Sequence, residues 1–142
     1  MNSITCDEGF KISKRLLNHP LHVESSAEGY SYRYFSKNKM KIHAGTVGST
    51  DNTIMLTDGS VAVVCDIRGI NEVTSIIVQK FKFQSDLFTE PIKSSSIGIV
   101  EVCEPSSSYE EIALQDLYSK CVLLPFKKGY VALTMVHGHL EN

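Results

Sequence analysis

Residues 53–69 read TIMLTDGSVAVVCDIRG, two β-rich segments that meet at Asp58 and Gly59. An Asp-Gly pair between alternating apolar residues is among the strongest short signals for a β-hairpin, because both residues tolerate the positive φ angles of a tight turn. Ile54 and Leu56 define one face of the first strand. The return strand is expected to place four alternating side chains on one face: Val61, Val63, Cys65 and Ile67. The stretch therefore predicts an antiparallel hairpin.

Further strands are expected where similar alternation recurs outside this hairpin. They cover residues 30–35, 39–48, 73–83, 97–103 and 129–137. Regular alternation of strands with helices is absent, which disfavours a doubly wound parallel sheet. The pattern predicts a mainly β fold, either a small antiparallel barrel or a meander packed on one helix.

Two segments are candidates for short helices. Residues 7–18 place acidic residues before basic ones, as a helix dipole favours, and Pro20 prevents continuation. Residues 109–121 fit a strand period through Ile112 and Leu114, but they also fit a capped helix. The Ser-x-x-Glu pattern at the start of this segment favours the helix.

The chain has 142 residues, which is the length of one ordinary domain. Hydrophobic residues make up 42 % and charged residues 21 %, so a core can form without metals or disulfides. We expect a single domain with a helix and connector over residues 1–29, a barrel over residues 30–137 and a tail over residues 138–142.

The formal net charge is −2, so the chain has no overall excess of cations for binding phosphates. No apolar run reaches the roughly 18 residues of a membrane span. The first residues lack the basic-then-apolar order of a secretory signal. These features predict a nuclear or cytosolic protein that is not secreted and has no membrane partner.

The cysteines form no Cys-x-x-Cys pair and are expected to be free thiols: Cys6, Cys65, Cys103 and Cys121.

Residues 39–118 resemble the core of an OB-fold. The resemblance is carried by KIHAGTVGSTDNTIMLTDGSVAVVCDIRG, then IGIVEVCEPSSS, then IALQDL. In that family a long strand with a glycine bend leads into a strand that ends in Asp-Gly-Ser or a similar turn. A valine-rich strand follows, and the fourth strand carries a central glycine. The resemblance implies an OB-fold-like barrel.

Among OB-fold proteins, this length and charge look most like small subunits of complexes that protect telomere ends or handle single-stranded DNA. Such subunits often bind other proteins more than nucleic acid. This chain has no Trp, no net positive charge and a long aromatic segment before the first barrel strand. These departures weigh against direct DNA binding.

Basic and aromatic residues interleave in two segments, as single-strand binding requires, because aromatic faces stack on bases and cations follow phosphates. The alternative is that the aromatic side chains pack one face of a strand while the lysines are solvated. The candidate residues are Tyr30, Tyr32, Arg33, Tyr34, Phe35, Lys39 and Lys41 in the first segment, and Lys80, Phe81, Lys82 and Phe83 in the second.

Two apolar runs are candidates for a protein interface, because a strand with apolar groups on both faces leaves one face to be covered. The alternative is that the N-terminal helix covers that face. The candidate residues are Ile76, Ile77, Val78, Val122, Leu123, Leu124 and Phe126.

Catalytic and metal sites find little support. His137 and His139 could bind a metal, but no third ligand is evident and a flexible tail explains them as well. Four carboxylates, Asp58, Asp66, Glu101 and Glu104, suggest a hydrolase, although Asp58 is explained by the turn.

The sequence therefore predicts a non-enzymatic subunit with no cofactor, which binds a protein partner in a hetero-oligomer within a DNA-maintenance complex. Direct single-stranded nucleic-acid binding and a small enzyme of unknown reaction are the alternatives.

Overall fold

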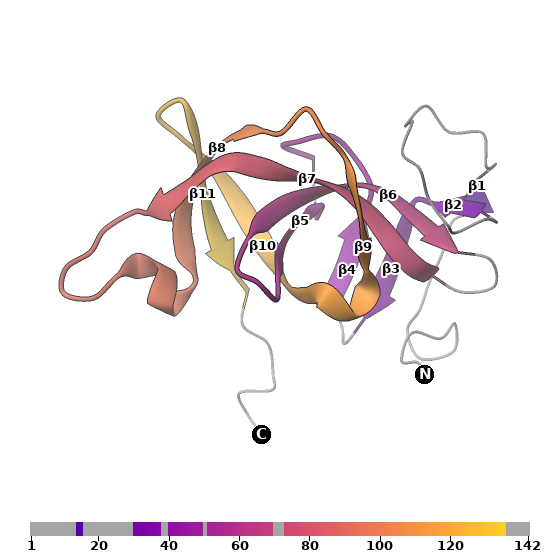
Figure 1. Cartoon of the computed structure of the whole chain (residues 1–142), viewed down its shortest axis with the longest axis horizontal. Helices are drawn as coiled ribbons and strands as arrows, with labels where there is room; N and C mark the ends of the chain where they lie inside the picture. Colours follow the sequence, from indigo (N-terminus) through magenta and orange to yellow (C-terminus); the bar gives the residue numbers. More distant parts are fainter. Residues whose placement is uncertain (1–13, 16–29, 38–39, 50, 70–72, 136–142) are drawn as a thin grey trace, which may run out of the picture.

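The computed structural model describes residues 14–15, 30–37, 40–49, 51–69 and 73–135. Nearly all regular structure in these residues is β-strand (Figure 1). The elements are β1 (Lys14–Arg15), β2 (Tyr30–Tyr32), β3 (Tyr34–Lys37), β4 (Met40–His43), β5 (Thr53–Leu56), β6 (Val61–Gly69), β7 (Val73–Asp86), the 3-10 helix η2 (Ser94–Ile97), β8 (Ile99–Pro105), β9 (Glu110–Ala113), the 3-10 helix η3 (Leu114–Asp116), β10 (Leu117–Phe126) and β11 (Gly129–Thr134).

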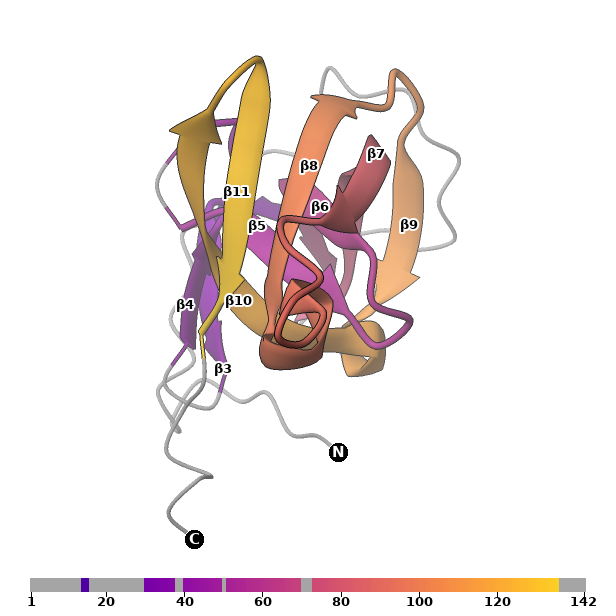
Figure 2. The ribbon, with the colours of Figure 1, turned by 90° about the vertical axis from the view of Figure 1, so that its left-hand side faces the viewer.

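Six strands close a ring in the order β5, β6, β7, β8, β11 and β10, because β10 pairs with β5 and β6 pairs with β7. Every pairing in the ring is antiparallel. Figure 2 shows β10, β11 and β8 on the side of the molecule opposite the β1–β2 end. The prediction of a mainly β, antiparallel fold is confirmed. An OB-fold has five barrel strands, so this ring of six does not confirm the OB-fold resemblance.

The predicted central hairpin is formed by β5 and β6, with Thr53 opposite Val63. Gly59 has φ of 91°, as the turn requires. The Asp58 carboxylate accepts a hydrogen bond from the Ser60 amide at 2.9 Å and another from the Ser60 hydroxyl. These bonds, the hydroxyl first, hold the pKa of Asp58 below its usual range. The hydrogen bonds within the turn thus explain the hairpin, and they give the Asp58 carboxylate a structural role.

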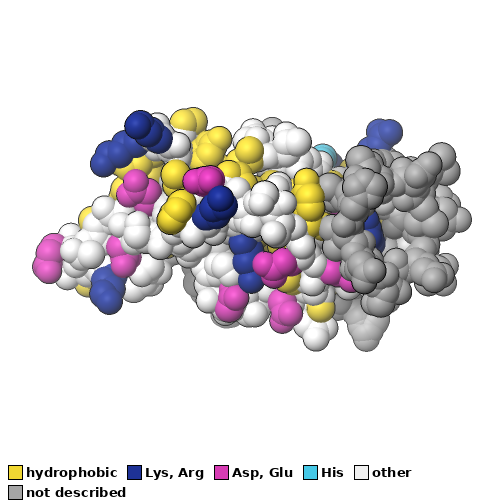
Figure 3. Space-filling view, turned by 45° about the horizontal axis from the view of Figure 1, so that its top comes forward, with side chains coloured by type: hydrophobic (Ala, Val, Ile, Leu, Met, Phe, Trp, Pro, Cys, Tyr) yellow, Lys and Arg dark blue, Asp and Glu magenta, His cyan; other side chains and the backbone are white. Residues whose placement is uncertain are grey.

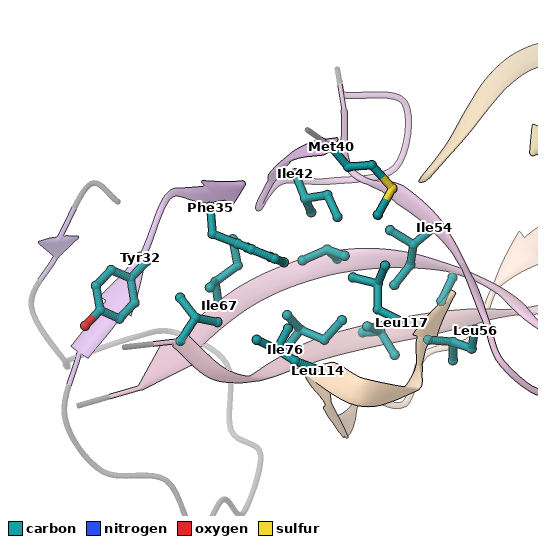
Figure 4. Close-up of a cluster of buried hydrophobic side chains, with 14 residues drawn as sticks. Tyr32, Phe35, Met40, Ile42, Ile54, Leu56, Ile67, Ile76, Leu114 and Leu117 are labelled. Atoms are coloured by element: carbon teal, nitrogen blue, oxygen red, sulfur yellow. The ribbon is translucent and has the colours of Figure 1, made fainter. Parts of the chain in front are cut away.

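Alternate residues of β6 enter two different hydrophobic clusters. Ala62 and Val64 belong to the first cluster, and Val61 and Val63 belong to the second. The first cluster also contains Phe35 and other side chains of the β3–β4 hairpin (Figure 4). The second cluster and the side chains packed against it include residues from all six ring strands. The β5–β6 sheet therefore separates two cores.

The long strand β7 changes partners along its length. Its first half pairs with β6 and β9, and its second half pairs with β8. Ile76, Ile77 and Val78 in the first half have no exposed surface. The expectation that one face of this segment is exposed is therefore wrong. Ile76 and Val78 share the first cluster with Phe35, so strands of the same chain cover them.

Two helix predictions need correction. Residues 109–121 form β9, η3 and the start of β10, because Ile112 pairs with Ile76 of β7 and Leu117 pairs with Leu56 of β5. Within the predicted helix at residues 7–18, Lys14 and Arg15 instead form β1, which pairs with β2. The other residues of that segment lie outside the described part of the chain, as does the predicted tail at residues 138–142.

Candidate protein-interaction face

Four neighbouring ring strands present one surface that points away from the second cluster. In β10, Cys121 and Leu123 pack with the second cluster, so the alternate residues Val122 and Leu124 point outward. The same alternation holds in β11 and β8. We call this surface the outer face and define it by Phe83, Ser85, Ile99, Glu101, Cys103, Val122, Leu124, Phe126, Val131 and Leu133.

Strand register arranges the outer face in rows that cross the sheet. Leu124 pairs with Val131, and Val131 pairs with Glu101. Val122 pairs with Leu133 in the row on one side, and Phe83 pairs with Cys103 in the row on the other. Because paired residues lie on the same side of a sheet, these side chains form one contiguous surface.

Three large apolar side chains on this surface are open to solvent, whereas Val131, which lies between Leu124 and Glu101, is only 7 % exposed. Phe83 is 59 % exposed, Leu124 is 47 % exposed and Val122 is 40 % exposed. Figure 3 shows hydrophobic side chains gathered over β8 and β11, with Lys and Arg side chains beside them. Single exposed apolar residues are ordinary, but a group of them on one side of a sheet is a candidate interaction surface.

The outer face also carries charge of both signs. Glu101 is half-buried between Val131 and Ser85, its partners on the neighbouring strands. Lys127 and Lys128 form the turn between β10 and β11 at one end of the face. Within the described part of the chain, none of these three residues forms an ion pair with another residue. By contrast, Lys82 at the edge of the face is paired with Glu104 at 2.9 Å.

The structure brings together several predicted site residues and separates others. Val122, Leu124 and Phe126 from the predicted interface lie on the outer face with Phe83 from the predicted nucleic-acid group. Leu123 instead packs against the second cluster. The sequence prediction missed four residues, Ile99, Cys103, Val131 and Leu133. Their strands alternate regularly, but the alternation does not reveal which side is covered.

The first basic and aromatic group is divided by burial. Tyr32 and Phe35 have at most 1 % exposed surface, so they are core residues and cannot stack on bases. Tyr34 faces outward beside His43, with ring centroids 5.4 Å apart, and Lys41 Nζ lies 4.7 Å from the Tyr34 ring centroid. Arg33 is exposed next to this group. Lys39 and the side chain of Tyr30 lie outside the described part of the structure.

The second basic and aromatic group offers little free charge. Lys80 pairs with Asp58 and Glu110, and Lys82 pairs with Glu104. Phe81 is 7 % exposed and packs against Tyr130 with ring centroids 6.2 Å apart. The Tyr34 group lies on the separate β3–β4 sheet, away from the second half of β7 in Figure 1. The two predicted groups do not form one surface.

Two of the described thiols and one buried carboxylate have clear structural roles. Burial raises the pKa of Cys65 and of Cys121 to about 11, which keeps both thiols protonated at neutral pH. The buried carboxylate of Asp66 accepts hydrogen bonds from Arg68 Nε at 2.8 Å and from the Ser31 hydroxyl at 3.2 Å. Among the described residues, no group of three or more His, Cys, Asp or Glu side chains could hold a metal ion. His137 and His139 lie outside these residues.

Comparisons with known proteins give a family but no function. No curated protein and no solved structure matches the chain. No helix within the described residues has the length and apolar character needed to cross a membrane. A family model described as "Domain of unknown function (DUF8592)" matches residues 17–135. Because this match covers most of the 142 residues, the chain belongs to the DUF8592 family.

Proposed function

We propose that this chain is a non-enzymatic subunit that binds a protein partner through the outer face. The observation that supports this proposal is the set of exposed apolar side chains on β7 and β10, with Phe83, Val122 and Leu124 each at least 40 % exposed. Protein interfaces are built around aromatic and aliphatic anchors surrounded by polar groups. The lysine turn would provide part of that polar surround, and Glu101 adds a charge within the apolar rows. The DNA-maintenance role implied by the OB-fold resemblance remains a prediction.

The strand pairing supports a partner that lies flat on the sheet. Along the outer face, β11 and β8 each pair with a strand on both sides, whereas, among the described residues, 122–126 of β10 pair only with β11 and the second half of β7 pairs only with β8. Over β11 and β8, in the middle of the face, no unpaired strand edge is therefore available for an added peptide strand. Side chains, rather than backbone hydrogen bonds, would make the contacts.

The exposed apolar surface should bind a hydrophobic dye in dilute solution, and Leu124→Lys should reduce that binding. A lysine at this position places a charge in the middle of the apolar rows, so it removes apolar surface without touching the core. The fluorescence of an environment-sensitive naphthalene sulfonate dye measures this binding. We expect a reduction of about a third, because Leu124 is one of three strongly exposed anchors.

Tyr118→Lys is the matched control for this experiment. Tyr118 lies on the same strand and is 61 % exposed, but it precedes the segment of β10 that forms the outer face. Both variants should keep the thermal midpoint of the wild type to within a few degrees. Dye binding that is absent in the wild type, or that Tyr118→Lys reduces as much as Leu124→Lys, would contradict the proposal.

A second candidate function is single-stranded nucleic-acid binding by the β3–β4 hairpin. The contact between Lys41 and Tyr34 favours it, because a half-buried aromatic ring that faces outward beside cations can stack a base and hold a phosphate. Titration with a labelled oligonucleotide at two salt concentrations should then show salt-dependent affinity, which Tyr34→Ala weakens and Lys93→Ala does not. Absence of binding at low salt would exclude this candidate.

A further inference from the structure

We infer that the partner of the outer face is a second copy of this chain, an inference that rests on the function proposed above. The outer face is a twisted antiparallel sheet surface made by β10, β11, β8 and the second half of β7. The surface that fits a sheet of this kind most closely is another sheet, packed face to face about 10 Å away. A second copy supplies such a surface.

The charges on the outer face are self-complementary. Glu101 lies within the apolar rows, and Lys127 and Lys128 lie at the end of the β10–β11 hairpin. In a symmetric dimer the twofold axis lies in the plane between the two packed faces. An axis that crosses the line from Glu101 to the two lysines at its midpoint, perpendicular to that line, places the acid of each protomer opposite the lysines of the other. The dimer would contain this contact twice.

The same pairing explains why an acid can be tolerated within an apolar surface. Burying the Glu101 carboxylate against an apolar partner would be unfavourable, because an unpaired charge loses its hydration. Within the described residues the chain supplies no cation to Glu101, whereas most other cations near the ring strands are paired with acids. The turn lysines of a second copy would supply the missing cation.

Charge reversal tests this inference on the intact chain. Sedimentation equilibrium should show that the wild type reversibly forms a species with twice the mass of the chain. Glu101→Lys should weaken this dimer by about tenfold or more in Kd, and Lys127→Glu with Lys128→Glu should do the same, because each opposes like charges across the interface. The variant with all three substitutions should recover the wild-type Kd to within a few fold. Lys41→Glu, on the separate β3–β4 sheet, is the control and should leave Kd unchanged.

Several outcomes would overturn the inference. One is a wild type that stays monomeric at every concentration, and another is a triple variant that dimerises no better than either partial variant. Circular dichroism of each variant shows whether it has folded, and recovery in the triple variant cannot arise from misfolding. A monomer that still binds the dye in a manner sensitive to Leu124→Lys would overturn only the second-copy inference. A monomer that binds no dye would overturn the proposed function as well.

Discussion

Phe35→Ala is expected to lower the free energy of unfolding by about 3–5 kcal/mol, the usual cost of truncating a buried phenylalanine. The Phe35 side chain has no exposed surface, and it packs in the first cluster with Ile67 and Ile76 of the ring strands. The alanine would leave a cavity between the β3–β4 hairpin and the β6–β7 sheet. Urea unfolding followed by circular dichroism measures the loss.

Ser36→Ala is the control for this prediction. Ser36 is the next residue of β3, and it pairs with Lys41, whose side chain is exposed. A change below about 0.5 kcal/mol is expected there, as for most surface substitutions. If Phe35→Ala lowered the free energy of unfolding by less than about 1 kcal/mol, Phe35 would not pack the β3–β4 hairpin against the β6–β7 sheet as described.

Stability is expected to fall as pH rises from 9 towards 11, and Cys121→Val is expected to remove part of this fall. Burial raises the pKa of Cys121 from 9.0 to about 11, so the folded state keeps the thiol protonated while the unfolded chain ionises. The stabilisation is complete below the unfolded pKa and is lost as pH approaches the folded pKa. A shift of about two pKa units corresponds to at most about 3 kcal/mol.

Thermal midpoints at several pH values between 7 and 11 provide the measurement. Tyrosines and lysines also titrate at the upper end of this range, so the informative quantity is the difference in slope between the wild type and Cys121→Val. The wild type should lose more stability between pH 9 and pH 11 than the variant. Identical slopes would show that Cys121 ionises as readily in the folded state as in the unfolded chain.

Local sequence signals predicted most strands, because alternation and turn chemistry act over a few residues, but they missed β10, which continues through Pro125. The Asp58–Gly59 turn needs only its own φ angles and the hydrogen bonds from Ser60. Residues 109–121 were different, since their pattern fits both a helix and a strand. Ile112 pairs with Ile76 of β7, which is distant in sequence, and this pairing makes the segment around Ile112 a strand.

The outer face could be predicted only in part for the same physical reason. Val122, Leu123 and Leu124 form a continuous apolar run, so the sequence does not show that Leu123 points into the core while its neighbours point out. Ile76 is equally apolar but is covered by strands from elsewhere in the chain. Which apolar face stays exposed depends on tertiary packing, and alternation alone does not contain that information.

The most direct test of the central claim is the rate at which a maleimide alkylates Cys103, measured over a wide range of protein concentrations. Cys103 lies on the outer face opposite Phe83, so a docked partner should cover it. The Cys6→Ser variant leaves Cys65 and Cys121 as the other thiols, and burial keeps both protonated and slow to react.

If a second copy docks on the outer face, the alkylation rate constant should fall by about tenfold or more between dilute and concentrated protein, as the dimer population grows. In Glu101→Lys, the alkylation rate constant should fall only at higher protein concentrations. A rate constant that is the same at every concentration, while the chain remains folded, would contradict the claim that another molecule of this protein covers the face.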